Sequence, residues 1–599
     1  MDEKLTVICA MALVGMLTLS GKCYPASIEY WTTHSLDKVF PDTPRPEGAS
    51  VAITLRAARN ETEDAQVIVR VPKGVEISSA HFSLPDLAGP NGATFSKENL
   101  SAYWVWYTYV LNNPKENTDP SMYLRRAPAF FPDAFLENPV IRIRDEWTQP
   151  LWVSVRVPKG TGPGTYSGAL AIDLTDGAGQ ATHFDVPLEL RVWPFTLPDE
   201  PRLHHTEWFS VDALANYYRI APWTEECWAW IEKVAEDMAR HKQDTILTPF
   251  WGLVQVRQDA AGALQCDFTA LDRWVETFKK AGVTWIEGSH VAGRSGGWES
   301  PIIWGRFHVL GADGQPLELS PSKVSEEQFE PYMKAYLQAV HAHLKERGWA
   351  ERYVQHIADE PIPANEASWI HRAKCVRKWL PGVPIIDAVM SEGLEGAIDI
   401  RVPQIQHVKP AKQRKSKEVF WSYVCLAPQG KYPNRFLDYP SIRNRILFWL
   451  SYTHDLEGFL HWGYNYWLTW SNVPAPVDVS PWLDATGASI YCADRLPLPA
   501  GDPHIVYPGK NRICSSIRWE VVRKGIEDYG YLYLLDDIAS HPKKYKAKKA
   551  DVDAARKLLK RVKTDIAAAP DKHTMNDQEL ISTREQLGNL LAAVIGERS

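Results

Sequence analysis

Cysteine is sparse in this sequence, and the few cysteines are scattered. The chain of 599 residues contains 8 cysteines, with no CxxC pair and no spacing typical of a zinc site. Most of them lie in apolar surroundings, where a free thiol is expected to be buried. The sequence therefore predicts neither a disulfide framework nor a metal centre, and no motif in it calls for a cofactor.

An excess of positive charge is also missing. The formal net charge is -7, whereas affinity for a phosphate backbone needs clustered lysine and arginine. One lysine-rich run exists at residues 543–563, but alanine, leucine and aspartate are interleaved with its lysines at helical spacing. That pattern is typical of the solvated face of a helix. We therefore expect no nucleic-acid partner.

Long apolar runs are confined to the N-terminus. Residues 5–19 are apolar, Lys4 precedes them, and Ser20 and Gly21 follow as small residues suited to cleavage. This pattern predicts an export signal over residues 1–22, too short to span a bilayer comfortably. Cys23 invites a lipoprotein interpretation, but Lys22 stands where a small residue is expected. We predict no integral membrane span and a protein exported to the periplasm or the medium.

The N-terminal part of the remaining chain has the pattern of a β-domain. Hydrophobic residues make up 45% and charged residues 23% of a chain without low-complexity tracts, which suits two or three globular domains. Over residues 27–195 apolar residues recur with period two, as in segments 51–55, 66–70, 151–155 and 188–192, between clusters of turn residues. We predict an antiparallel β-sandwich, followed by a linker at residues 195–201.

From residue 202 the pattern changes to strand followed by helix. Strands are expected at residues 204–209, 245–249, 285–290, 353–358, 384–389, 419–424 and 458–461, and helices at 225–241, 268–281, 325–347 and 365–380. This alternation predicts a (β/α)8 barrel over residues 202–535, with its active site at the carboxyl ends of the strands. Residues 538–599 are expected to be a helical appendage, with helices at 547–568 and 577–595 separated at Pro570.

Two adjacent acids, Asp359 and Glu360, end the fourth predicted strand. Neighbouring side chains on a regular strand point to opposite faces, so the two carboxylates share a site only if the strand ends there. Pro361 supports such an ending, because it cannot continue the ladder and keeps Glu360 out of the helical region. An exposed acid pair that caps the next helix is the alternative. Placement at a barrel strand end favours catalysis.

Tryptophan is abundant around this position, with 25 in the chain. Flat aromatic faces with a polar edge suit sugar rings, although each tryptophan taken singly fits a core position equally well. Several tryptophans lie at predicted strand ends: Trp208, Trp251, Trp421, Trp462 and Trp467. Tyr423 and Tyr464 could complete the wall of a sugar site, and His290 could donate to a hydroxyl or serve the structure. Asp387, on the next strand, could orient the sugar or Asp359.

The acid pair also belongs to a recognisable motif. Residues 356–361 (HIADEP), with 516–520 (SIRWE) and 523–529 (RKGIEDY), resemble glycoside hydrolase family 123, the bacterial β-N-acetylgalactosaminidases. The segments ARNE at 58–61 and GTYSG at 164–168 resemble that family's β-sandwich. The resemblance runs from about residue 27 to residue 535.

The resemblance implies an exo-acting, retaining and substrate-assisted mechanism. The 2-acetamido oxygen of the sugar would attack the anomeric carbon, which departs from the scheme of two opposed carboxylates. Glu360 would act as the acid and then the base, and Asp359 would hold the acetamido group. The partner is then a glycan or glycolipid. Arg518, Glu527 and Asp528, in the closing motif, are expected to join barrel and helix by ion pairs.

Three functional alternatives stay open at this point. A β-N-acetylglucosaminidase would use the same fold and acid pair on a different sugar. A hydrolase of a non-acetylated glycan would need a nucleophile that the sequence does not identify. A noncatalytic carbohydrate-binding protein would need neither acid, and the presence of Asp359 and Glu360 counts against it.

Overall fold

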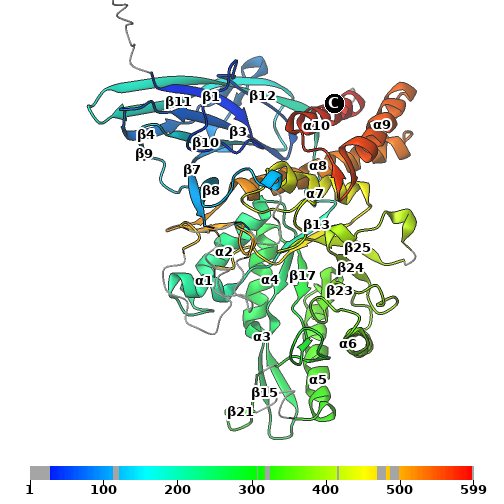
Figure 1. Ribbon diagram of the computed structural model, residues 1–599. Coiled ribbons are helices and arrows are strands. Elements are labelled where there is room, and N and C mark those ends of the chain that lie inside the picture. Colours follow the sequence, from blue (N-terminus) through cyan, green and yellow to red (C-terminus); the bar gives the residue numbers. More distant parts are fainter. Residues whose placement is uncertain are drawn as a thin grey trace, which may run out of the picture.

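The computed structural model describes residues 27–111, 113, 120–306, 308–317, 324–414, 417–467, 480–483, 485 and 498–596. The predicted export signal and Cys23 lie outside these ranges. The described chain forms a β-sandwich, then a barrel of parallel strands with outer helices, then C-terminal helices that return to the sandwich (Figure 1). The predicted fold class is confirmed. None of the described helices combines the length and apolarity needed to cross a bilayer.

The sandwich has two sheets. One has the strand order β1-β3-β10-β7-β8 and the other β2-β12-β11-β4-β9, with β5 paired to β11 and β6 paired to β5. Alternate residues of β11 and β12, among them Leu170, Ile172, Leu188 and Leu190, are buried between the sheets. The strands are β1 (Glu29–His34), β2 (Ile53–Arg59), β3 (Glu61–Arg70), β4 (Ile77–Ser83), β5 (Leu87–Ala88), β6 (Thr94–Phe95), β7 (Leu100–Val110), β8 (Ala129–Phe135), β9 (Ile141–Ile143), β10 (Thr148–Val157), β11 (Gly164–Asp176) and β12 (Ala181–Thr196).

Two details of the sandwich differ from the prediction. β12 pairs with β2 in parallel, so the sandwich is not wholly antiparallel. β12 also runs on to Thr196, past the expected start of the linker. Pro194 is tolerated there because the pairing with β2 shifts register between Val192 and Thr196. No ladder hydrogen bond to β2 therefore requires the N–H that proline lacks.

Eight parallel strands form the barrel, in the order β13-β26-β25-β24-β23-β22-β17-β14. The two end strands, β13 and β14, leave the sheet nearly closed. Side chains of Val354, Ile386, Val402, Trp421 and Leu460 fill the interior. The strands are β13 (His204–Glu207), β14 (Thr245–Thr248), β17 (Trp285–Gly288), β22 (Tyr353–His356), β23 (Ile385–Val389), β24 (Ile400–Pro403), β25 (Val419–Tyr423) and β26 (Gly458–His461).

One barrel strand was not predicted. β24 is four residues long, contains Arg401, and follows β23 after residues 390–399, which form turns and no helix. The outer helices are α1 (Val211–Tyr218), α2 (Glu225–Arg240), α3 (Phe250–Leu253), α4 (Thr269–Ala281), α5 (Glu326–Glu346), α6 (Glu366–Trp379), α7 (Ile442–Thr453) and α8 (Ile517–Ser540). The four longer helices expected before residue 381 are confirmed to within one residue at each end.

Short strands extend the barrel loops. A four-stranded sheet lies beside α5 at the end of the molecule away from the sandwich (Figure 1). It contains β15 (Gln255–Gln258), β16 (Leu264–Asp267), β20 (Val309–Leu310) and β21 (Pro316–Leu317). Two hairpins pair β18 (Ala292–Arg294) with β19 (Ile302–Trp304), and β27 (Tyr507–Pro508) with β28 (Ile513–Cys514).

The C-terminal segment is helical, as expected, with α9 (Lys549–Arg561) and α10 (Asp577–Gly596). A hairpin of β29 (Ala567–Ala569) and β30 (Lys572–His573) separates them, with Pro570 in its turn. All lysines of the run at residues 543–563 are exposed, as the solvated-face interpretation requires. The boundary drawn between residues 535 and 538 falls inside α8.

Buried ion pairs join α8 to the sandwich. Arg518 Nη2 lies 2.8 Å from Asp133 Oδ2 of β8, and Arg523 Nη2 lies 2.7 Å from Asp64 Oδ2 of β3. Arg523 Nη1 also lies 3.1 Å from Glu527 Oε2. The expected ion pairs between barrel and helix are present only for Asp528, which pairs with an arginine of α7. Arg518 pairs with the sandwich instead, and Glu527 pairs within its own helix.

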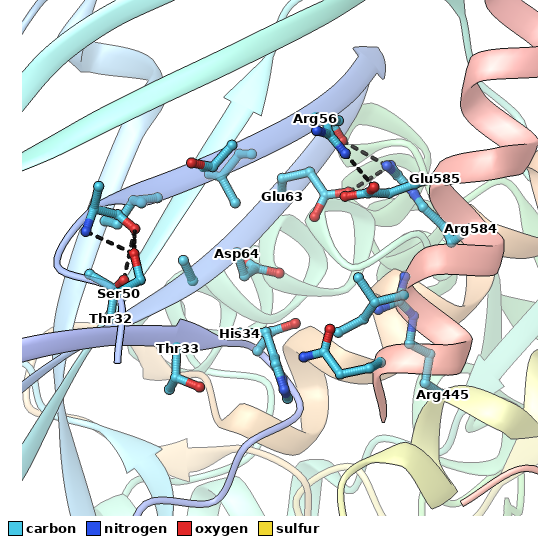
Figure 2. Close-up of a pocket in the computed structure, with 18 residues that line it drawn as sticks. Thr32, Thr33, His34, Ser50, Arg56, Glu63, Asp64, Arg445, Arg584 and Glu585 are labelled. Atoms are coloured by element: carbon cyan, nitrogen blue, oxygen red, sulfur yellow. Dashed lines mark hydrogen bonds and ion pairs between the residues drawn. The ribbon is translucent and has the colours of Figure 1, made fainter. Parts of the chain in front are cut away.

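A polar cavity of about 390 Å³ lies between the sandwich strands β1, β2 and β3 and helix α10 (Figure 2). Arg584 of α10 lies 2.6 Å from Glu63 of β3, and Arg56 of β2 pairs with Glu585. His34 and Asp64 face the cavity from the sandwich. Paired charges thus line this junction between the sandwich and the C-terminal helix.

Candidate active site

The acid pair lies just beyond the end of β22. Ile357 and Ala358 leave the strand ladder, and their N–H groups each donate to Asp387 Oδ2 at 3.0 Å. The N–H of Glu360 donates to the carbonyl of Ala388 at 3.1 Å. The chain is therefore held against β23 while it turns, and the strand ending that the prediction required is present.

Glu360 has a backbone conformation that is unusual for a side-chain-bearing residue, with φ at 47°. The left-handed region costs such a residue about 1–2 kcal/mol. Arg294 of β18 stabilises this turn, because its Nη1 donates to the carbonyl of Asp359 at 3.0 Å and its Nη2 to that of Glu360 at 2.7 Å. The turn brings both adjacent side chains into one cavity, as the regular strand alternation would not.

That cavity has a volume of about 560 Å³ and opens at the carboxyl ends of the barrel strands. Asp359 and Glu360 contribute its acids, together with Asp212 from the first turn of α1. The rest of the lining is mainly aromatic and aliphatic: Trp208, Phe209, Val211, Leu247, Pro249, Ala388, Tyr423, Cys425, Leu426, Leu460, Trp462, Tyr466 and Leu498, with Ser210. Such a lining suits the apolar faces of a sugar.

The two carboxyl groups titrate as a pair. Burial and the charge of Asp359 raise the pKa of Glu360 to about 7, against the smaller opposing effects of a hydrogen bond from Tyr423 and of Arg294. The Asp359 side chain is open to solvent within the cavity, yet protein surrounds it closely enough that the loss of bulk water raises its pKa. The charge of Asp359 thus favours the protonated form of Glu360.

Behind the pair lies a buried row of charged groups. His356 places Nδ1 2.6 Å from Asp387 Oδ1 and Nε2 2.5 Å from Glu287 Oε1. Burial opposes a charge on this imidazole, but the hydrogen bonds to Asp387 and Glu287 outweigh it and raise the pKa of His356 to about 10. His290 Nε2 lies 3.4 Å from Asp387 Oδ1. Burial disfavours ionisation of Asp387 too, but its contacts with the two histidines lower its pKa.

His290, His356 and Asp387 are close enough together to be considered as metal ligands, with potential ligand atoms within 4.8 Å of one another. The donor chemistry does not fit this use. A metal needs a neutral imidazole with a free lone pair, whereas both nitrogens of His356 face carboxylates and hold protons. We interpret the row as a support for the acid pair.

Several predicted site residues line the cavity or contact the acids. Tyr423 Oη donates to Glu360 Oε1, and Trp462 lines the cavity while its Nε1 donates to Asp502 Oδ2 at 3.3 Å. Asp387 holds the backbone before the acids, and His290 packs against both Trp208 and His356. Neither Asp387 nor His290 is among the residues that line the cavity, so the structure gives them supporting positions and no contact surface for a sugar.

Three predicted tryptophan and tyrosine side chains also lie outside the cavity lining. Trp421 is buried in the barrel interior, stacked on His204 with ring centroids 5.6 Å apart. Tyr464 is fully buried and donates to Asp237 Oδ2 at 2.8 Å. Trp251 donates to the carbonyl of His290 at 3.1 Å, so it supports the site from behind. The prediction that these side chains form the sugar-binding wall is corrected accordingly.

Other functional residues were not selected from the sequence. Arg294 acts on backbone carbonyls, which no residue pattern records, and Asp212 has the ordinary appearance of an acid in the first turn of a helix. Trp208 was noted only as one of several strand-end tryptophans. Its Nε1 donates to Glu287 Oε1 at 2.9 Å, which anchors the indole at the cavity wall.

Comparisons with known proteins identify the family of this chain. Residues 208–535 match the family model for the glycoside hydrolase 123 catalytic domain, and residues 37–174 match the model for the glycoside hydrolase 123 N-terminal domain. A solved structure of a family 123 glycoside hydrolase from Clostridium perfringens, studied for glycolipid glycan hydrolysis, matches with a TM-score of 0.69 at 14% identity, covering 95% of this chain and 99% of that one. At that identity the structural match shows the fold alone.

A GH10 xylanase from Thermobacillus composti matches with a TM-score of 0.29 at 12% identity, covering 55% of this chain and 97% of that one, which carries no weight here. A comparison with curated protein sequences gave no match. The catalytic-domain model alone covers more than half of the chain and includes the acid pair. The chain belongs to glycoside hydrolase family 123.

Proposed function

We propose that this glycoside hydrolase removes terminal β-linked N-acetylgalactosamine by substrate-assisted, retaining catalysis. The observation that carries the proposal is the entry of Asp359 and Glu360 into one cavity from consecutive positions at the end of β22. Two carboxyl groups so placed stand on the same side of a bound sugar. That arrangement suits a reaction in which the substrate supplies its own nucleophile.

In the first step, the 2-acetamido oxygen attacks the anomeric carbon and closes an oxazolinium ring. The glycosidic bond breaks, and its oxygen takes the proton of Glu360. The pKa of Glu360, about 7, lets this group hold a proton near neutral pH. The mainly apolar lining of the cavity maintains this pKa by limiting hydration of the carboxylate.

In the second step, the Glu360 carboxylate takes a proton from water, and the resulting hydroxyl oxygen attacks the anomeric carbon. The oxazolinium ring opens and restores the acetamido group, so two inversions retain the configuration. Asp359 accepts a hydrogen bond from the acetamido N–H and stabilises the positive charge of the ring. Arg294 donates to the backbone carbonyls of Asp359 and Glu360, and so holds the two side chains in position through these steps.

The cavity supports exo action on a small terminal unit. Its volume of about 560 Å³ lies within the range of roughly 300–1,000 Å³ usual for small-ligand pockets. The choice of N-acetylgalactosamine rests on membership of family 123. The similar Clostridium perfringens protein was studied for glycolipid glycan hydrolysis, so we propose glycans or glycolipids as substrates. We also propose export, on the basis of the signal-like residues 1–22, with N-terminal sequencing of the secreted protein as its test.

Hydrolysis assays test this proposal. The wild type and Glu360→Gln are each given an aryl β-N-acetylgalactosaminide and an aryl β-N-acetylglucosaminide. We expect chromophore release from the first substrate and inhibition by the sugar-derived thiazoline that mimics the bicyclic intermediate. Near-normal turnover of an unactivated substrate by Glu360→Gln would refute the role of Glu360. Preference for the glucosaminide would change the sugar and keep the mechanism.

Asp212 favours one specific alternative, hydrolysis of a non-acetylated glycan. It is the third acid of the cavity and comes from a different strand end than the acid pair. In this alternative Asp212 would be the nucleophile and Glu360 the acid. Resistance to the thiazoline, together with loss of turnover in Asp212→Asn, would support it. Sensitivity to the thiazoline with turnover retained in Asp212→Asn would exclude it.

A further inference from the structure

Three donor groups of different chemistry meet on the outside of the barrel, between α5 and α6. Glu330 comes from α5, while His371 and Cys375 lie one turn apart on α6, at the i and i+4 positions that share a helix face. Cys375 Sγ lies 3.7 Å from Glu330 Oε1 and 3.9 Å from His371 Nε2. His371 Nε2 lies 3.8 Å from the same Glu330 oxygen.

These distances can be compared with those in a tetrahedral zinc site. Zinc binds nitrogen and oxygen at about 2.0–2.2 Å and thiolate sulfur at about 2.3 Å, so neighbouring ligand atoms are separated by roughly 3.3–3.7 Å. Each of the three distances is within a few tenths of an ångström of this range. A hydrogen bond from the thiol to Glu330 accounts for one distance and an ion pair of His371 with Glu330 for another. All three donor atoms nevertheless lie at the mutual spacing of ligands around one ion.

A fourth donor is available one helical turn earlier on α5. Glu326 Oε1 lies 3.6 Å from His371 Nε2. Arg372 pairs with Glu326, lies 3.9 Å from Glu330 Oε1, and packs with its guanidinium carbon 4.9 Å from the centre of a Trp304 ring. Two glutamates and one thiolate carry three negative charges, which Zn²⁺ and Arg372 together balance. The arginine thus completes the charge of a metal site and holds its carboxylates.

We propose that Glu330, His371 and Cys375, with Glu326 as the fourth ligand, bind Zn²⁺ and join α5 to α6. The mixture of sulfur, nitrogen and oxygen selects a borderline ion such as Zn²⁺ over Mg²⁺ or Ca²⁺, which need oxygen ligands throughout. The ion can enter from solvent, because the His371 and Glu326 side chains are 58% and 48% exposed. Binding releases the thiol proton to water and changes no other covalent bond.

The position of this site suggests what the ion would stabilise. In the chain, α5 precedes β22 and α6 follows the acid pair. Joining the two helices would hold the connections on both sides of the strand that carries Asp359 and Glu360. The proposed ion is a structural one, and it does not rest on the proposed function.

Cobalt and zinc binding to the full chain tests the proposal. After removal of metals with a chelator, addition of Co²⁺ should produce the thiolate-to-cobalt absorption band, and Zn²⁺ should abolish it with one equivalent bound per chain. Zn²⁺ should also raise the unfolding temperature, because it binds the folded chain. Cys375→Ser should remove the band, and His371→Ala should weaken zinc binding by at least about tenfold.

The control is Cys266→Ser, which removes another half-buried thiol, on β16. It should leave the cobalt band and the zinc stoichiometry unchanged. A cobalt complex without a thiolate band, or a band that survives in Cys375→Ser, would overturn the proposal. His371→Ala alters an exposed side chain, so it decides the question if Cys375→Ser does not fold. Unchanged zinc affinity in His371→Ala would also overturn it.

Discussion

Replacing Tyr423 with phenylalanine should move the alkaline limb of the enzyme's pH profile upward. Tyr423 Oη donates a hydrogen bond to Glu360 Oε1, and this bond lowers the pKa of Glu360 against the effects of burial and of Asp359. Without the bond the Glu360 carboxylate is less stable, so its proton is lost at higher pH. Because Glu360 acts as an acid in the first step, its deprotonation sets the alkaline limb.

The size of the change follows from the strength of one charged hydrogen bond. Such bonds contribute about 1.5–3 kcal/mol, and one pKa unit corresponds to about 1.4 kcal/mol. The pKa of Glu360, about 7 in the wild type, should therefore rise by about 1 to 2 pH units in Tyr423→Phe.

The assay is kcat/KM for an aryl β-N-acetylgalactosaminide across the pH range, which reports the ionisations of the free enzyme. Tyr452→Phe is a matched control, because Tyr452 Oη donates to Asp536 Oδ1 at 3.1 Å outside the cavity. Its alkaline limb should coincide with that of the wild type. An alkaline limb in Tyr423→Phe that stays in place or moves to lower pH would refute the reasoning.

Three further predictions concern stability. The folded-state pKa of Glu360, about 7, lies above its usual 4.5, so the wild type loses stability as the pH rises from 4.5 to 7. Glu360→Gln should therefore be more stable than the wild type above pH 7, by at most about 3 kcal/mol. Near pH 4 the two proteins should be equally stable in urea unfolding. His356→Leu removes the imidazole partner of buried Glu287 and leaves Asp387 with His290 alone, and it should cost about 3–5 kcal/mol in the same assay. In Gly458→Ala the new Cβ would lie 2.1 Å from Trp421 Cδ2, so thermal unfolding should show a loss of about 1–3 kcal/mol. A loss below about 0.5 kcal/mol in either of the last two would contradict the packing described.

Regular alternation explains why most of the fold was predictable. Most strands are apolar runs bounded by turn residues, and most long helices have recognisable ends. Ser325, whose side chain caps α5, is an example of such a helix end. β24 has neither a preceding helix nor a long apolar run, and it is a strand because its neighbours β23 and β25 pair with it. The parallel pairing of β12 with β2 is likewise determined by tertiary packing and not by a local sequence pattern.

The sequence predicted which strands carry the candidate site, but not how far along the barrel axis each side chain lies. Trp421 and Tyr423 are two residues apart on β25 and share a strand face, so a pattern treats them alike. Along the barrel they differ by about 7 Å, which puts Trp421 in the interior and Tyr423 against Glu360. Arg294 was missed because it contacts the carbonyls of the acids and not their side chains.

The position of α8 has a consequence for how the protein can be divided. The family's catalytic-domain match ends at residue 535, within this helix. A fragment limited to that match would keep Arg523 and Lys524 but lose Asp64 and Glu61, their buried partners in the sandwich. Unpaired buried charges of this kind are strongly destabilising. The two family modules are thus one cooperative folding unit, and gene fusions or expression trials that separate them should yield insoluble chains.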